Sequence, residues 1–177
     1  MNGLDTIETA RLRLCRLSLA SLRGLLDGMV GEIDGAAVPD EWRQAAAPTL
    51  RRRIAQIEGT PESAPFLVRA IIDPGAGRVV GRIGFHGPPG ANELGAPDAL
   101  ELGYWIEPAS RRCGYAAEAI HGLLEWAGTE HAIRRFILSI SPGNAASLGL
   151  ARKLGFVEVG RHLDDEDGEE LVFELCR

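Results

Sequence analysis

The segment LELGYWIEPASRRCGYAAEAIHGLL, residues 100–124, decides the fold of this chain. Its first part, 100–106, is apolar and rich in aromatic and β-branched residues, which predicts a strand that ends at Pro108. A basic turn with a glycine follows at 111–114, and from Ala116 onward apolar residues recur on one helical face. Backbone N–H groups of such a turn, together with the positive end of the helix dipole, can hold a phosphate. The segment therefore predicts a phosphate-binding strand–turn–helix unit.

Composition predicts one globular domain over residues 1–177, because 45% of the residues are hydrophobic and 25% are charged. The net charge of −6 argues against a nucleic-acid partner and is compatible with an amine or basic-peptide substrate. No apolar run approaches the roughly 20 residues that span a bilayer, so we expect no membrane partner and a cytoplasmic location. Three scattered cysteines and four histidines without ligand spacing predict neither a disulfide framework nor a metal site.

The rest of the chain predicts an alternation of strands and helices. The expected elements are a strand at 9–17, a helix at 18–26, a loop at 28–39, a helix at 40–57 interrupted or kinked near Pro48, hairpin strands at 66–73 and 78–85, an exposed loop at 86–99, a helix from 116 to about 128, a strand at 134–141, a helix from Asn144 to Gly155, and a final hairpin of 156–161 and 170–175 around the acidic turn 164–168. Pattern alone predicts an α/β or α+β protein with a mixed sheet. Trp42 is expected to pack in the core, with substrate contact as the alternative, and Gly81 and Gly84 are expected to be close-packing positions.

Two motifs resemble those of the GNAT acetyltransferases. Arg111-x-x-Gly114-x-Ala116 is similar to motif A, the loop that holds the pyrophosphate of acetyl-coenzyme A, and it lacks the lysine of a P-loop. The string from Asn144 to Phe156 is similar to motif B, N-x-x-S-x-x-x-x-x-K-x-G-F. The wider strings GYWIEPASRRCGYAAEA and TARLRL resemble the RimJ/RimL-like branch of that family.

The resemblance implies the GNAT acyl-CoA N-acyltransferase fold, a mixed sheet of about seven strands flanked by helices. It also implies transfer of an acetyl group from acetyl-CoA to a primary amine, on a protein N-terminus or a small molecule, by direct attack on the thioester. The resemblance is also compatible with a homodimer. The residues that the resemblance assigns to the cofactor are Trp105, Ile106, Glu107, Arg111, Arg112, Cys113, Gly114, Tyr115, Ala116, Asn144 and Ser147.

The reaction needs a proton acceptor for the attacking amine and a proton donor for the departing thiolate. Relatives place a glutamate at the position of Glu101, which is therefore the expected base; a purely orienting role is the alternative, and Asp98 and Glu93 stand in reserve. Many relatives use a tyrosine as the donor, but Ala151 occupies that position here. The hydroxyl of Ser147 is the expected donor instead.

Several alternatives stay open at this level. The chain is compatible with a non-catalytic acyl-CoA-binding sensor or interaction domain, and with transfer of a larger acyl group. Cys113 lies at a helix N-terminus beside two arginines, which would suit an acyl-cysteine mechanism, but no histidine is near it in sequence. Arg111 and Arg112 either add charge for the phosphates or are only solvated. The acceptor is chosen by residues 28–60 and 86–99, where the pattern is weakest.

Overall fold

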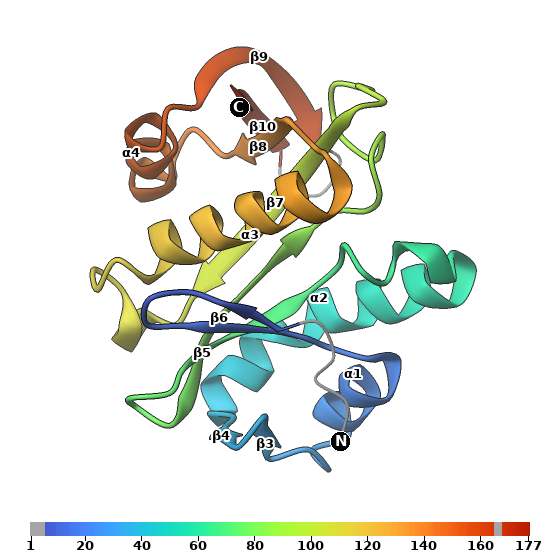
Figure 1. The fold of residues 1–177 in the computed structure, drawn as a ribbon, viewed down its shortest axis with the longest axis vertical. Helices are drawn as coiled ribbons and strands as arrows, with labels where there is room; N and C mark the ends of the chain where they lie inside the picture. Colours follow the sequence, from blue (N-terminus) through green and yellow to red (C-terminus); the bar gives the residue numbers. More distant parts are fainter. Residues whose placement is uncertain (1–5, 165–167) are drawn as a thin grey trace. The chain divides into compact units, whose positions relative to one another are not determined.

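The structure is a computed structural model, and it describes residues 6–164 and 168–177 of the chain. It has two compact units. The N-terminal unit comprises the described residues up to Gly84 together with Tyr104–Trp126, and the C-terminal unit comprises Phe85–Gly103 and the described residues from Ala127 onward. Three elements contribute residues to both units: strands β6 (Arg78–Phe85) and β7 (Ala99–Ile106) and helix α3 (Tyr115–His131) (Figure 1).

Along its main path, the sheet of the N-terminal unit is antiparallel. Its neighbouring strands, in order, are β1 (Ile7–Glu8), β2 (Arg13–Arg16), β5 (Arg69–Asp73) and β6. The end of β7 lies against β6, since the N–H of Glu107 donates to the carbonyl of Val80 at 2.9 Å. Gly81 and Gly84 are close-packing positions as predicted, because a Cβ at either would lie 2.5 Å from a backbone oxygen.

Two helices bury their apolar faces in this unit. Helix α1 (Leu19–Leu26) begins as predicted at Ser18, whose side chain accepts a hydrogen bond from the N–H of Ser21. Helix α2 (Asp40–Gly59) is one helix that continues through Pro48, so of the two predicted alternatives, an interruption or a kink, the interruption is wrong. Proline removes one helical hydrogen bond, but α2 buries an inward face that includes Trp42, Leu50 and Ile57, and this burial outweighs the loss.

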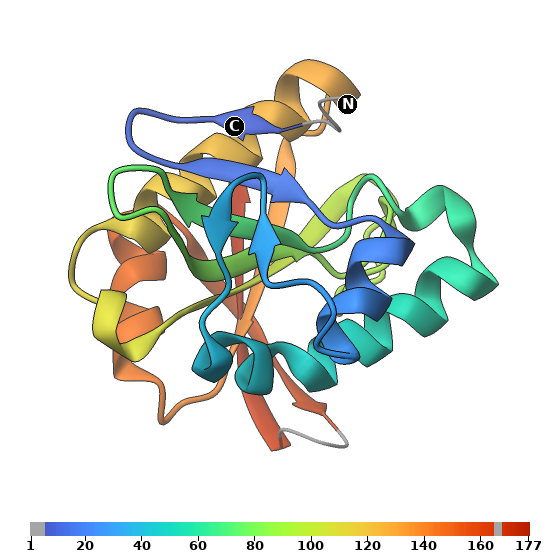
Figure 2. The same cartoon turned by 90° about the horizontal axis from the view of Figure 1, so that it is seen from below.

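The predicted loop at 28–39 contains a small hairpin of β3 (Glu32–Ile33) and β4 (Ala36–Ala37) (Figure 2). Asp34 and Gly35 form its turn with φ values of 50° and 75°. Both central residues of a type I′ turn need positive φ, which Asp-Gly accepts readily. The dipeptide was a hairpin signal that the pattern analysis missed.

The C-terminal unit has a parallel pair and two antiparallel pairs of strands. Strand β8 (Arg135–Ile140) pairs in parallel with β7, β10 (Gly168–Cys176) pairs with β8, and β9 (Val157–Asp164) pairs with β10. The β7–β8 ladder covers only the residues from Ala99 to Glu101, and β7 runs on beyond it. Helix α4 (Ala145–Lys153) begins and ends as predicted. Part of the predicted acidic turn, 165–167, lies outside the described residues.

The mixed sheet with its helices confirms the predicted α/β class. The additional strands, relative to the expectation, are the two-residue strands β1, β3 and β4. Helix α3 reaches His131, slightly beyond its predicted end, and buries Ile120, Leu123 and Leu124 on the predicted face. Within the described ranges, no helix is both long and apolar enough to cross a membrane.

Candidate active site

The turn between β7 and α3 lies wholly in the N-terminal unit. A short 3₁₀ helix, Pro108–Ser110, follows the strand, and Arg112 and Gly114 then adopt left-handed backbone conformations with φ values of 63° and 82°. The N–H of Glu118 donates to the carbonyl of Gly114 at 3.1 Å, so the N–H groups between these residues precede the helical ladder. This conformation places several backbone donors at the positive end of a helix, which fits an anion such as a pyrophosphate.

Gly114 meets two separate requirements of this turn. Its φ of 82° is a conformation that L side chains rarely adopt, and a Cβ there would lie 3.3 Å from the Nη2 atom of Arg11. The backbone conformation and the nearness of Arg11 therefore both favour glycine at this position.

The residues at the end of β7 differ in what their backbone can still bind. The N–H of Glu107 is already bonded to Val80, and the carbonyl of Ile106 accepts from the Nε of Arg111 at 3.0 Å. The buried carboxylate of Glu107 pairs with Arg78 at 3.0 Å. Trp105 precedes these two residues and lies within β7.

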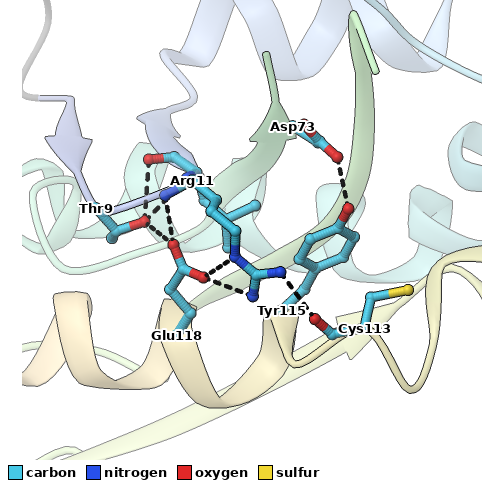
Figure 3. A network of polar contacts seen from close by, with 7 residues as sticks. Thr9, Arg11, Asp73, Cys113, Tyr115 and Glu118 are labelled. Atoms are coloured by element: carbon cyan, nitrogen blue, oxygen red, sulfur yellow. Dashed lines mark hydrogen bonds and ion pairs between the residues drawn. The ribbon is translucent and has the colours of Figure 1, made fainter. Parts of the chain in front are cut away.

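A network of side chains fixes the turn from the N-terminal strand region (Figure 3). The guanidinium of Arg11 donates to Glu118 at 2.7 Å and to the carbonyl of Cys113 at 3.1 Å, and it lies over the ring of Tyr115. The same carboxylate accepts from the hydroxyl of Thr9 at 2.7 Å. Burial raises the pKa of Glu118, but the hydrogen bonds from Thr9 and Arg11 outweigh it and hold that pKa below its usual value. Glu118 is therefore a structural residue of this turn.

A second contact ties the first residue of α3 to the β5–β6 hairpin. The hydroxyl of Tyr115 donates to Asp73 at 2.5 Å, and Asp73 also accepts from the N–H groups of Gly75 and Ala76. The hydrogen bond with Tyr115 lowers the pKa of Asp73 and raises that of Tyr115. The start of α3 is thus held on two sides.

Glu101, the expected base, is buried in the C-terminal unit, with a side chain 1% exposed. One oxygen accepts from the hydroxyl of Ser139 at 2.7 Å, and the other accepts from the N–H of Glu93 at 2.8 Å. The Nδ1 atom of His86 lies 3.6 Å from the Glu101 carboxylate, and the His86 side chain is 41% exposed. Its Nε2 atom lies over Gly103, where a Cβ would come within 3.1 Å. His86 is the solvent-facing member of this pair.

The loop at 86–99 is exposed only in part. Its backbone is held by Glu101 at Glu93 and by Asn92, whose side chain bonds to both the N–H and the carbonyl of Ala96. Ala96 is buried. The reserve carboxylates have partners of their own, since Glu93 lies 3.0 Å from His162 and Asp98 lies 3.3 Å from Arg135.

The motif B helix places Asn144 and Ser147 together. The Asn144 side chain accepts from the N–H of Ser147 at 3.1 Å, which confirms its predicted role as a helix cap. Ser147 is half-buried on the first turn of α4, and Ala151 is buried one turn later.

Two other residues from the sequence analysis have clear positions. Trp42 is 0% exposed, and its indole N–H donates to the carbonyl of Gly81 at 2.9 Å, which confirms that it packs in the core. Cys113 is an exposed free thiol in the turn. The residues that sequence reasoning missed are Arg11, Asp73 and His86; for Arg11 the available signal was the TARLRL string that contains it.

Comparison with known proteins gives the family. Residues 11–157 match the model described as the acetyltransferase (GNAT) domain. The chain belongs to the GNAT acetyltransferase family. It is 27% identical over 162 residues to the N-acetyltransferase YjdG of Bacillus subtilis (strain 168), a match that covers 85% of this chain and 89% of that protein.

Solved GNAT structures share the fold along almost the whole chain. A GNAT-family acetyltransferase from Bacillus anthracis has a TM-score of 0.62 and 20% identity over 97% of this chain and 98% of that one. RimL, the ribosomal L7/L12 alpha-N-protein acetyltransferase solved with coenzyme A, has a TM-score of 0.67 and 15% identity over 97% and 98%. MccE, the microcin C7 self-immunity acetyltransferase solved with acetyl-CoA and AMP, has a TM-score of 0.64 and 16% identity over 95% and 93%. The predicted GNAT fold is confirmed, and the family's cofactor is acetyl-CoA.

Proposed function

We propose that this protein transfers the acetyl group of acetyl-CoA to a primary amine on a small molecule or a protein N-terminus. The turn at 111–116 carries the proposal, because its left-handed residues and the start of α3 supply the donors that a pyrophosphate needs. We assign the N–H groups from Arg112 to Ala116 to the pyrophosphate, with Arg111 adding charge. We assign the backbone of Trp105 and Ile106 to the pantetheine arm, and the motif B resemblance assigns Asn144 and Ser147 to that arm as well.

When bound, acetyl-CoA supplies an acetyl group activated as a thioester. The chain then has to orient the amine beside that group, which can be worth roughly 7–11 kcal/mol. Because β7 extends beyond its ladder with β8, its free edge after Glu101 is suited to hold an extended arm by backbone hydrogen bonds. The backbone of Trp105 lies on this part of β7.

The proton of the acceptor ammonium needs a base, and we assign it to His86 acting with Glu101. Both oxygens of Glu101 already accept hydrogen bonds, and its side chain is buried. The imidazole of His86 is partly exposed and faces that carboxylate. A neighbouring buried carboxylate stabilises an imidazolium as it forms. His86 therefore accepts the proton. The carboxylate of Glu101 orients the imidazole and stabilises its positive charge.

The departing thiolate needs a proton donor, and we assign this role to the hydroxyl of Ser147. It lies on the first turn of α4, beside the capping residue Asn144. Ala151 supplies no hydroxyl one turn later, which leaves Ser147 to act from this helix.

A thiol-release assay with acetyl-CoA against peptides, polyamines, aminoglycosides and amino acids tests the function. We expect turnover with one class of amine and a loss of turnover in Glu101→Gln and His86→Gln. Ser147→Ala tests the donor, and full turnover in that variant would contradict its assignment. Tight binding of acetyl-CoA without release by any amine would favour the alternative, a non-catalytic acyl-CoA-binding sensor. Transfer from longer acyl-CoA thioesters measures the acyl preference.

A further inference from the structure

The guanidinium of Arg82, on β6, is partly buried in the N-terminal unit, where no carboxylate of the described residues pairs with it. It lies over the indole ring of Trp105, 5.0 Å from the ring centroid, and both side chains are half-buried. Its Nη1 atom is fully buried and has no hydrogen-bond partner in the part of the chain that the structure describes. Neither does any carboxylate among the described residues pair with Arg82. A half-buried guanidinium without a counter-charge is costly, and an acceptor from a ligand would lower that cost.

A second buried cation is close to the first. Arg53 lies on the inward face of α2, is 8% exposed, and donates to the side chain of Gln56 at 2.8 Å. Burial, together with the positive charges of Arg52 and Arg82, lowers the pKa of Arg53 to about 10. Burial alone lowers the pKa of Arg82 to about 10. Both side chains remain charged at neutral pH, so the region between α2 and β6 is electropositive.

The position of Arg82 along the sheet connects it with the reaction. Trp105 is the residue whose backbone we assign to the arm that carries the thioester. Side chains stand roughly perpendicular to the strand, so the indole of Trp105 and the Arg82 above it lie on one face at that same point of β7. On the proposed function, a group bound by Arg82 would lie on the same part of β7 as the arm that carries the thioester.

We propose that Arg82, supported by Arg53, binds an oxyanion of the acceptor, so that the substrate is an amine that also carries a carboxylate or a phosphate. The planar guanidinium fork accepts either group through paired hydrogen bonds. The inference rests on the proposed function and narrows its acceptor class. It excludes polyamines and aminoglycosides, whose charges are all positive and would be repelled by the two arginines.

Matched acceptors test this directly, because each pair differs only in the oxyanion. One set of assays compares amino acids with their carboxamides, and a second set compares amino-sugar phosphates with the free amino sugars. We expect the acid of one pair to exceed its neutral partner in kcat/KM by roughly 10- to 100-fold, the range of a hydrogen-bonded charge. The set of assays in which this occurs shows whether the oxyanion is a carboxylate or a phosphate.

Three variants separate the site from general effects of charge. Arg82→Gln should remove the preference by raising KM for the acid while kcat changes little. Arg82→Lys, which keeps the charge and loses the fork, should restore part of it. Arg51→Gln removes an exposed arginine from α2, the helix that carries Arg53, and should leave the preference unchanged. Equal use of the acid and its neutral partner by the wild type, or an unchanged preference in a folded Arg82→Gln, would overturn the inference.

Binding without turnover distinguishes this inference from the proposed function. Acetate and inorganic phosphate serve as probes, read by the quenching of tryptophan fluorescence and by the shift in Tm. We expect one of the probes to bind to the wild type and to Arg51→Gln but not to Arg82→Gln. If this holds while no amine is acetylated, the proposed function fails and the oxyanion site stands. If amines are acetylated but neither probe binds, the oxyanion site fails alone.

Discussion

The carboxylate of Glu118 and the guanidinium of Arg11 form hydrogen bonds of 2.7 Å across 107 residues of sequence. Arg11 precedes β2, and Glu118 lies in the first turn of α3. The pair does not itself face the expected ligand; it holds the backbone that does, because Arg11 also bonds to the carbonyl of Cys113 within the turn. The N-terminal strand region in this way supports the turn to which we assign the pyrophosphate.

Loss of the Glu118 charge should loosen that turn. We expect Glu118→Gln to lower the free energy of unfolding by about 1–2 kcal/mol, because its hydrogen bonds to Thr9 and Arg11 lose their ionic partner. KM for acetyl-CoA should rise while kcat is largely kept. Chemical denaturation and steady-state kinetics measure the two effects. Glu130→Gln, an exposed change on the same helix, serves as the control and should alter neither.

The same carboxylate predicts how stability depends on pH. The pKa of Glu118 is lowered in the folded state by its hydrogen-bond donors, although burial opposes the shift. A depressed carboxylate pKa stabilises the fold above the unfolded-state value near 4.3, and this stabilisation is lost as the pH falls through the folded-state pKa. The wild type should therefore lose more stability than Glu118→Gln between about pH 5 and pH 3. Parallel Tm profiles of the two proteins would contradict this.

Gly114 should be the least replaceable residue of the turn. Gly114→Ala adds a side chain at a φ of 82° and 3.3 Å from Arg11, so we expect KM for acetyl-CoA to rise at least about 10-fold. Isothermal titration with coenzyme A measures the same loss without turnover. Gly59→Ala is a matched control, since a Cβ there meets nothing within 4 Å. Normal coenzyme A affinity in Gly114→Ala would show that the pyrophosphate binds elsewhere.

The histidine–glutamate pair gives a prediction for the chemical step. His86→Gln should lower kcat by roughly 10²–10⁴-fold, the usual contribution of a general base, and leave the affinity for coenzyme A unchanged. Added imidazole should restore part of the activity in that variant. His121→Gln, an exposed change, should behave as the wild type. If His86→Gln keeps full kcat, the proton leaves by another route, for which Asp98, Glu93 and water are the candidates.

A substitution of Trp42 tests whether this residue only packs in the core or also contacts the acceptor. Trp42→Phe removes the indole donor and leaves the buried carbonyl of Gly81 without it, which should cost about 1–3 kcal/mol of stability. Specific activity of the folded fraction should be unchanged at temperatures well below the lowered Tm. A change in KM for the acceptor at full stability would instead indicate substrate contact.

The parts of the fold that could be predicted are those with local signals. Ser18 and Asn144 cap their helices as expected, because a cap is a contact between residues three apart in sequence. The continuity of α2 through Pro48 could not be predicted, since the burial that keeps this helix continuous comes from the sheet on which it packs. A local rule cannot include that contribution.

The candidate site is divided in the same way between local features, which could be predicted, and contacts between distant residues, which could not. The turn at 111–114 was visible because its residues are adjacent, whereas Arg11 and Asp73 reach it from other elements. The role of Glu101 was only half predictable: its place on β7 came from the resemblance, but its burial and its contact with His86 depend on how two strands and a loop meet. Likewise, nothing in the sequence pairs Arg82 with Trp105.

Arg112 keeps a positive φ although it is not a glycine, and such a conformation costs of order 1–3 kcal/mol. Contacts from Arg11, Arg111 and the Tyr115–Asp73 pair fix the turn around it, so this cost is met when the chain folds. On the proposed binding mode the turn is therefore preorganised for the pyrophosphate, and preorganisation of this kind spares binding free energy. We therefore expect acetyl-CoA to associate in one step, with a rate limited by encounter rather than by rearrangement of the protein.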